Sequence, residues 1–358
     1  MKALQNQKTT FKSIINQIIT AFFYFCGIII YMCQSKLNLV ETEKGIKLIK
    51  DNFEKKLAKE LNLMRVSAPL FVTNKSGLND NLNGVEKPVN FKISGVDDDI
   101  EIVHSLAKWK RLALKMYDIP VDSGIYTDMN AIRKDEIEDS IHSIYVDQWD
   151  WEKHISKEER TIKYLKSIVR NIYKAMLKTQ KTVLKEYPNL EKVFVDKITF
   201  ITSKKLLSLY PNLTSKEREN EITKKYGSVF IIGIGNKLKN KKPHDLRAPD
   251  YDDWNLNGDI LIYYPPLNEA VELSSMGIRV DNKSLVRQLE ITNNMQRLTL
   301  PFHKALLNNE LPLSIGGGIG QSRLCLVLLN KIHIGEVQSS IWDDEETSLA
   351  AKNNIKLL

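Results

Sequence analysis

Apolar positions recur at three- and four-residue steps in two long segments of the chain, a spacing that predicts amphipathic helices. The first segment covers residues 44–63 and the second covers residues 157–187, where lysines and glutamates follow the opposite face. The same period predicts shorter helices at three further places: residues 215–225, 281–299 and 301–309. We expect both long helices to pack their apolar faces on the core.

Short apolar runs between these segments predict strands. They cover residues 65–72, 100–104, 197–202, 228–233, 259–264 and 270–274. The first contains Pro69, which is typical of an edge or interface strand. The last two are joined through Pro265-Pro266 and should pair antiparallel. The order of elements predicts one α/β (α+β) domain over residues 37–358, an antiparallel sheet flanked by helices.

The first 36 residues differ from the rest. Residues 13–35 carry no charge, and about 20 apolar residues suffice to cross a bilayer. Two interpretations stay open: a membrane anchor, or an artefact of the assigned start, with Met32 as the true first residue. A membrane partner is expected only if residues 13–35 belong to the protein.

Composition excludes a disordered, a collagen-like and a coiled-coil chain. The chain has 358 residues, of which 42% are hydrophobic and 27% charged, as in ordinary folded domains. Its net charge is +8, but four lysines and no acid lie in residues 1–36, which leaves +4 for the remainder. That excess is small for an RNA-binding protein. Three cysteines without metal-ligand spacing favour a reduced, cytoplasmic protein.

Three polar clusters lie in the first half of the chain. Residues 79–84 read as a turn. Residues 104–111 place three cations around Trp109, either to hold carboxylates or as a basic surface. Residues 147–152 alternate, so a strand there would turn Gln148 and Asp150 into a pocket and bury Trp149 and Trp151.

Two more clusters lie in the second half. Asp250–Asp253 alone is best read as an exposed acidic loop, whereas Asp259 and Glu272 sit on apolar strands and need a partner or a cation. We expect them to form a Mg²⁺ site beside phosphates. Residues 316–320 read as a glycine-rich loop that opens a helix, without the Gly-Lys-Ser/Thr of a P-loop. Cys325 within that helix is expected to be a buried, inert thiol.

Several stretches carry a resemblance to a known family. The run Gly318–Arg323 is similar to motif 3 of the class II aminoacyl-tRNA synthetases, Arg133 to the motif 2 arginine, and Pro69 to the motif 1 proline at a dimer interface. The chain more closely resembles the ammonia-dependent asparagine synthetases, over residues 37 to 358. The matching stretches are 104–111, 145–152, 244–254, 256–261, 272–281 and 316–324.

The resemblance implies a class II synthetase-like core, a homodimer and a reaction. L-aspartate, ATP and ammonia would give L-asparagine, AMP and diphosphate through β-aspartyl-AMP. Free ammonia is the expected donor, since a glutamine-dependent enzyme needs a nucleophilic cysteine and the chain begins Met1-Lys2.

The resemblance also assigns roles to residues. Arg133 would bridge the α-phosphate and the reacting carboxylate, Arg323 would hold the outer phosphates, and Asp252 would lie near the ammonia. The other ATP-binding residues would be Asp259, Glu272, Ser274, Gly318 and Gly320, with Asp259 and Glu272 as the Mg²⁺ ligands. Aspartate would be held by Asp80, Ser105, Lys110, Gln148, Asp150, Ser275 and Arg279.

Two alternatives remain. An aspartyl- or asparaginyl-tRNA synthetase would need an anticodon-binding module, for which residues 1–43 are too few and too apolar. A non-catalytic paralogue that senses an amino acid or a nucleotide would not need the charged residues that are present at every expected catalytic position.

Overall fold

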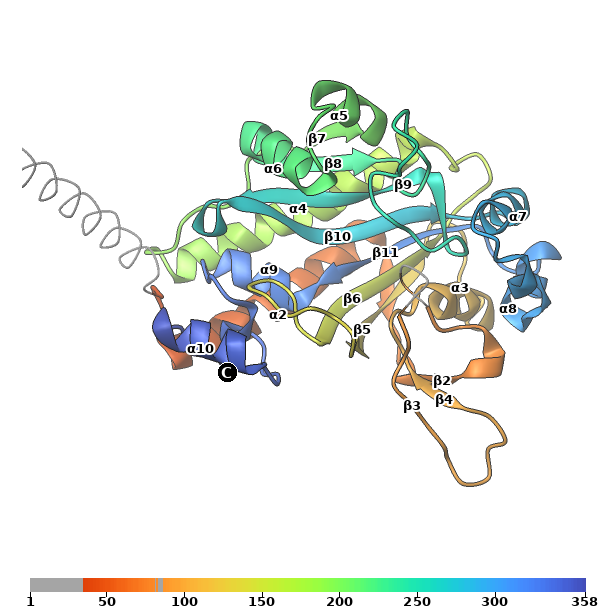
Figure 1. Ribbon diagram of the computed structural model, residues 1–358, viewed down its shortest axis with the longest axis horizontal. Helices are drawn as coiled ribbons and strands as arrows, with labels where there is room; N and C mark the ends of the chain where they lie inside the picture. Colours follow the sequence, from red (N-terminus) through yellow and green to blue (C-terminus); the bar gives the residue numbers. More distant parts are fainter. Residues whose placement is uncertain (1–34, 81, 83–85) are drawn as a thin grey trace, which may run out of the picture.

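A computed structural model describes residues 35–80, 82 and 86–358. Its centre is an eight-stranded sheet in the order β1-β5-β6-β11-β10-β9-β8-β7 (Figure 1). The strands are β1 (Leu63–Arg65), β5 (Gly124–Ile132), β6 (Tyr145–His154), β11 (Ser314–Gly320), β10 (Glu269–Arg279), β9 (Asp252–Tyr264), β8 (Ser228–Ile232) and β7 (Thr199–Thr202). The six central strands pair antiparallel, whereas β1 and β7 pair parallel at the two edges. This confirms the predicted antiparallel sheet.

Both predicted long helices form and cover one face of the sheet (Figure 1). They are α2 (Leu39–Leu61) and α4 (Ile162–Glu186), and they pack together beside α9 (Gln321–Leu328). Each begins at a polar cap, Asn38 for α2 and Thr161 for α4, and these caps shift the starts from the predicted positions. Their buried side chains join those of the sheet in the main core.

The shorter elements surround the ends of the sheet. α5 (Ser203–Leu209) and α6 (Ser215–Tyr226) lie at the β7–β8 end, and α10 (Asp344–Lys352) lies near the C-terminus (Figure 1). The segment predicted as one helix over residues 281–299 divides at Asn293, which has a positive φ, into α7 (Asn282–Ile291) and a 3₁₀ turn (Met295–Thr299). α8 (Pro301–Leu307) packs against that turn.

A second, three-stranded sheet projects beside α3 (Ala107–Met116) (Figure 1). Its strands are β2 (Phe71–Thr73), β4 (Ile100–Ile102) and β3 (Asn90–Phe91). The single strand predicted over residues 65–72 is therefore wrong: its two ends join different sheets, and Pro69, which has no N–H to donate, lies between them.

The loop predicted at residues 316–320 is also wrong, since this segment is the central strand β11. Glycine is required there for space. A Cβ at Gly316 would overlap the carboxylate of Glu152, and one at Gly318 would overlap the amide of Gln148. Polar side chains of β6 occupy the volume that β11 leaves open.

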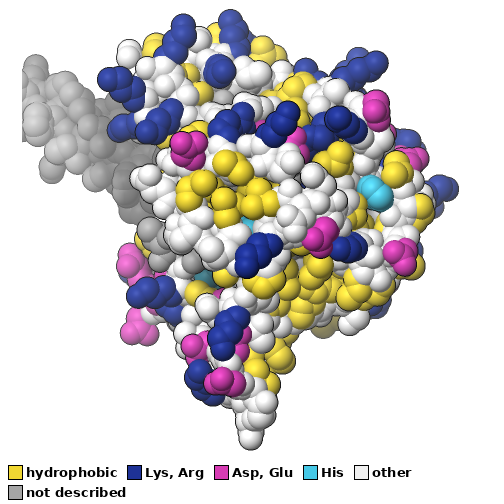
Figure 2. Space-filling view, turned by 90° about the vertical axis from the view of Figure 1, so that its right-hand side faces the viewer, with side chains coloured by type: hydrophobic (Ala, Val, Ile, Leu, Met, Phe, Trp, Pro, Cys, Tyr) yellow, Lys and Arg dark blue, Asp and Glu magenta, His cyan; other side chains and the backbone are white. Residues whose placement is uncertain are grey.

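The candidate membrane segment at residues 13–35 lies outside the described residues, except for Ser35. Among the described helices, none is long and apolar enough to span a bilayer. Figure 2 shows lysine and arginine side chains gathered along the upper edge of the molecule, where α5 and α6 lie in Figure 1. The exposed Lys204, Lys205, Lys224 and Lys225 belong to these two helices.

Candidate active site

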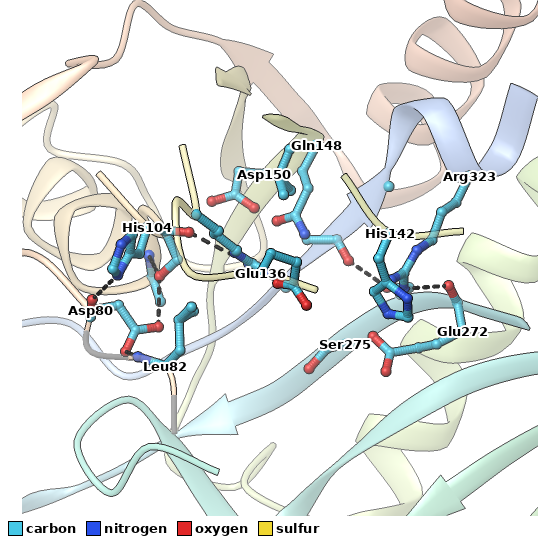
Figure 3. A pocket seen from close by; sticks show the side chains of 18 of the residues that line it. Asp80, Leu82, His104, Glu136, His142, Gln148, Asp150, Glu272, Ser275 and Arg323 are labelled. Carbon is cyan, nitrogen blue, oxygen red and sulfur yellow. Dashed lines mark hydrogen bonds between the residues drawn. The ribbon is translucent and has the colours of Figure 1, made fainter. Parts of the chain in front are cut away.

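One large cavity opens on the face of the sheet that α2 and α4 leave uncovered, and it holds about 430 Å³. Its floor comes from β6, β10 and β11, and its walls from α3, the β5–β6 loop and residues 245–252. The alternation predicted for β6 is confirmed. Gln148 and Asp150 line the cavity, while Trp149 and Trp151 are buried on the other face, where Trp149 contacts Phe53. Figure 3 shows polar groups at both ends of this cavity.

Lys110 lies at one end and is almost fully buried. Its Nζ is 3.1 Å from Asp150 Oδ2 and donates to the Gly317 carbonyl at 2.9 Å. Burial lowers the pKa of Lys110, and Asp150 opposes that shift. All three cations of residues 104–111 are buried, so the basic-surface interpretation of this cluster is wrong. Lys110 is therefore paired with Asp150, a residue that was itself predicted to bind the substrate.

Arg279 is enclosed by protein carboxylates. Its guanidinium donates to both oxygens of Glu152, at 2.7–3.1 Å, and to Asp252 Oδ1 at 2.5 Å. Burial alone would raise the pKa of Glu152, but Arg279 and Lys110 outweigh it and lower that pKa. Arg279 lines the cavity as predicted. Most of its N–H groups already donate to Glu152 and Asp252, so Arg279 holds these two side chains in place.

Asp80 reaches the cavity from the segment before β3. Ser105 donates to its Oδ2 at 3.0 Å, and His104 Nδ1 lies 3.0 Å from its carbonyl oxygen. Burial raises the pKa of Asp80, and Lys108 opposes that shift. Ser105 and Lys110 were both expected to hold a carboxylate of aspartate, but here each contacts a different acid of the protein.

Arg133 follows β5 directly and begins the loop to β6. Its Nη2 lies 3.5 Å from the His104 carbonyl, and its buried Nε has no hydrogen-bond partner among the described residues. Asp139 closes the loop, accepting from the N–H groups of Ile141 and His142 at 2.8 Å each. Despite partial burial, the His142 ring and those N–H groups lower the pKa of Asp139 to about 2.

Arg323 stands in the first turn of α9. It donates to the Glu272 carbonyl at 3.1 Å and to the Ile141 carbonyl at 3.2 Å. Ser274 donates to the Gly318 carbonyl at 2.9 Å, which fixes β10 against β11. Six of the residues to which the resemblance gave roles at the site line the cavity: Arg323, Glu272, Ser274, Ser275, Gly318 and Gly320. His142 lies beside Arg323 and Glu272 in Figure 3.

Comparison with known proteins identifies the family. A family model described as aspartate-ammonia ligase matches residues 40–354. A protein of Clostridium perfringens named aspartate–ammonia ligase is 59% identical over 90% of this chain and 96% of its own length. One of Fusobacterium nucleatum with the same name is 58% identical over 90% of this chain and 99% of its length. The chain belongs to the aspartate-ammonia ligase family.

Solved structures share the fold of this chain. The chain is similar to the asparaginyl-tRNA synthetase of Entamoeba histolytica in complex with asparaginyl-adenylate, with a TM-score of 0.59 at 15% identity. That match covers 84% of this chain and 66% of the synthetase. The asparaginyl-tRNA synthetase of Pyrococcus horikoshii gives a TM-score of 0.55 at 13% identity, covering 83% and 68%. The class II synthetase fold predicted from the motifs is confirmed.

The two predicted metal ligands of this ligase are placed differently. Glu272 lines the cavity, but Asp259 does not. Both oxygens of Asp259 accept from Arg247 at 2.7 Å. Burial raises the pKa of Asp259, and repulsion from Glu272 and Asp245 adds to the shift against the effect of Arg247. Among the described residues no three His, Cys, Asp or Glu side chains could hold a metal ion by themselves.

The exposed acidic loop expected at Asp250–Asp253 is wrong. Asp250, Asp252 and Asp253 are buried. Asp250 accepts from Arg297 at 2.9 Å and lies 2.9 Å from His303 Nε2. Asp252 lines the cavity as expected, and its Oδ2 is buried without a hydrogen-bond partner among the described residues. Burial raises the pKa of Asp252, and Arg279 opposes that shift.

Sequence reasoning gave no role to several cavity residues. They are His104, Glu136, His142, Asp147, Asp245, Arg247 and Tyr251. Arg247 was visible in the charged stretch 244–254, yet its place beside Asp259 and Ser275 depends on how that stretch folds onto β9 and β10. His142 could have been found from its position, nine residues after Arg133 in the same loop.

Proposed function

We propose that this chain makes L-asparagine from L-aspartate, ammonia and ATP, through β-aspartyl-AMP, and releases AMP and diphosphate. Family membership supports this reaction. The observation that carries it is a single cavity with two unlike ends. One end offers Asp80, with Lys110, Gln148 and Asp150, which suits an amino acid, and the other offers Arg323, which suits a triphosphate. Arg133 lies near the His104 carbonyl and would contact both substrates.

The first step joins the two substrates. A side-chain carboxylate oxygen of aspartate attacks the α-phosphorus of ATP, the bond to the β-phosphate oxygen breaks, and diphosphate leaves. Charge builds on the phosphoryl oxygens in the transition state, so fixed cations stabilise it. We assign this stabilisation to Arg133, whose buried Nε is unpartnered in the described structure, and the outer phosphates to Arg323.

The second step makes the amide. The nitrogen of ammonia attacks the activated carbonyl carbon, AMP leaves with the bonding electrons, and a proton is lost from nitrogen. Asp252 is our candidate near the incoming ammonia, since its free Oδ2 and raised pKa let it hold or accept a proton. Cys325 is fully buried and burial raises the pKa of its thiol to about 12, which supports free ammonia over glutamine as the donor.

On binding, aspartate would replace contacts that the protein residues now make with one another, such as the pair between Lys110 and Asp150. Its ammonium would be received by Asp80, Gln148 and Asp150, and one of its carboxylates by Lys110. Ser105 would orient Asp80, to which it already donates. Ser275 and Arg279 would line the path between amino acid and adenylate.

Mg²⁺ would be held with the phosphates of ATP rather than by the protein alone. The donor set fits such an ion, because Glu272 extends into the cavity and repulsion among Glu272, Asp245 and Asp259 leaves negative charge to be offset. Asp259 could contact the ion only if its carboxylate oxygens, which accept from Arg247, were shared between Arg247 and the ion. When bound, the ion would offset charge on the phosphates that leave as diphosphate.

A homodimer is part of the proposal, and the cytoplasm is the compartment that we propose for it. Exposed apolar side chains occur on β1, on the small sheet and between them, at Met64, Leu70, Phe71 and Phe91. Phe71 and Phe91 stack edge to face at 5.6 Å. An exposed aromatic pair of this kind suits a self-association surface. Sedimentation of the purified protein at one subunit mass would contradict it.

The decisive experiment measures products. Purified protein with aspartate, ATP, Mg²⁺ and ammonium should form asparagine and AMP in equal amounts, and chelating the Mg²⁺ should stop both. Added tRNA should change neither rate nor products. Asparagine formation that requires tRNA, or charging of tRNA with aspartate or asparagine, would replace this proposal with the tRNA synthetase alternative.

A further inference from the structure

The β5–β6 loop brings Arg133, Glu136 and His142 to the nucleotide end of the cavity. It has no regular secondary structure between β5 and β6. Asp139 binds the N–H groups of Ile141 and His142, which shapes the second half of the loop. These hydrogen bonds join residues within the loop, so they do not attach it to the rest of the molecule.

One anchor is the hydrogen bond from Arg323 of α9 to the Ile141 carbonyl. Further anchors come from a segment almost 200 residues later, which we call the C-terminal brace, residues 334–343. It makes three hydrogen bonds to the loop. Ile334 N–H donates to the Ser140 carbonyl at 2.8 Å, and Asp343 N–H donates to Glu138 Oε2 at 3.0 Å. Ser143 Oγ donates to Ser340 Oγ at 3.0 Å. The bonds are spread along residues 138–143, so the brace holds the loop at several points.

The brace is itself fixed to the fold. Gln338 donates to Ser322 Oγ in α9 at 3.1 Å, and both Ile334 and Gln338 line the cavity. The His333 ring packs on Trp342 with centroids 4.8 Å apart, and its Nε2 lies 3.0 Å from Glu346 in α10. The loop is thus connected through the brace to the same helix that carries Arg323.

We propose that the C-terminal brace sets the position of the ATP-binding loop, and that Glu138 and Ser340 are positioning residues for the nucleotide end of the site. This rests on the proposed function only in naming the nucleotide as ATP. A loop released from its anchors must be ordered by the ligand instead, at a cost in conformational entropy. The residues proposed to bind aspartate on α3 and β6 are Lys110, Gln148 and Asp150, and in the described structure none of them hydrogen-bonds to the brace. Aspartate should therefore be bound as before.

The experiment compares two variants with two matched controls in the full chain. Glu138→Ala and Ser340→Ala each remove one bond between loop and brace. Glu345→Ala and Ser348→Ala remove the same side chains from exposed positions of α10, where the described structure records no bond to the loop. Each brace variant should raise the KM for ATP about three- to tenfold, as one hydrogen bond predicts, and the double variant more. The KM for aspartate should change less than twofold.

Two further measurements separate positioning from other roles. Glu138→Gln keeps an oxygen acceptor for the Asp343 N–H and should restore the KM for ATP. Binding of a non-hydrolysable ATP analogue and hydrogen exchange at the amides of Ile141 and His142 need no turnover, so they test the brace even if no asparagine forms. Unchanged ATP affinity and exchange in the double variant, or equal changes in both KM values, would overturn the inference.

Discussion

The two ends of the cavity are built on different principles. At the aspartate end, Lys110, Glu152 and Arg279 are almost completely buried on helix and strand and are already paired. Toward the nucleotide end, Arg133 and His142 stand on the β5–β6 loop and are partly exposed, and among the described residues Arg133 has only a long contact to the His104 carbonyl. Charges fixed within the sheet suit a small substrate of one shape, whereas a loop can close around a nucleotide.

The difference teaches where each end is vulnerable. Buried charges lose most when a partner is removed, because the remaining charge cannot be solvated. Replacing a partly exposed group mainly removes its interaction with substrate and leaves no buried charge behind. Substitutions at the aspartate end should therefore reduce stability and activity together, and those at the nucleotide end should reduce activity alone.

The largest effect is expected for Arg279→Met. It leaves Glu152 and Asp252 buried without their partner, so the free energy of unfolding should fall by about 3–5 kcal/mol. Urea unfolding followed by circular dichroism measures it. Arg65→Met is the matched control, since the exposed Arg65–Asp128 pair should contribute less than about 1 kcal/mol. Equal losses in the two variants would remove the distinction between the ends.

Arg133→Ala should come next, with an effect on chemistry only. Loss of one fixed cation at the transferring phosphoryl group should reduce aspartate-dependent ATP–diphosphate exchange about 10²–10³-fold. The unfolding midpoint should stay within the range of Arg65→Ala, which serves as the control. Near-normal exchange would refute the role assigned to Arg133, and a large loss of stability would show that the nucleotide end also depends on buried pairing.

The smallest effect is expected for Cys325→Ala, on the core side of the helix that carries Arg323. The thiol has a pKa of about 12, so it stays protonated and should resist alkylation by iodoacetamide at pH 8 in the folded protein. The variant should keep full ammonium-dependent activity, and glutamine should support neither form. Turnover with glutamine in the native protein, lost in the variant, would make Cys325 a nucleophile.

Hydrophobic periodicity predicted the two long core helices and several core strands, and the alternation in β6 predicted part of the cavity floor, whereas the core strand β11 was predicted as a loop. The period of two in β6 predicted which face holds Gln148 and which holds Trp149, because alternation depends only on neighbouring residues. Burial of the acids at positions 250–253 could not be predicted, since their partners come from distant parts of the chain: Arg297 and His303 for Asp250, and Arg279 for Asp252. The position of Asp259 outside the cavity has the same cause, because Arg247 reaches it from a separate loop.

The glycines of β11 have a consequence for how this strand can vary. Elsewhere in a sheet, valine and isoleucine are the favoured substitutions, but at Gly316 and Gly318 any side chain meets polar groups of β6. Tolerance to change at these positions should then be coupled: an alanine at Gly318 is accommodated only when Gln148 and Asp150 move aside or are shortened. A library that randomises β11 alone should return glycine, whereas one that also randomises Gln148 should yield paired solutions, with the substrate pocket reshaped between them.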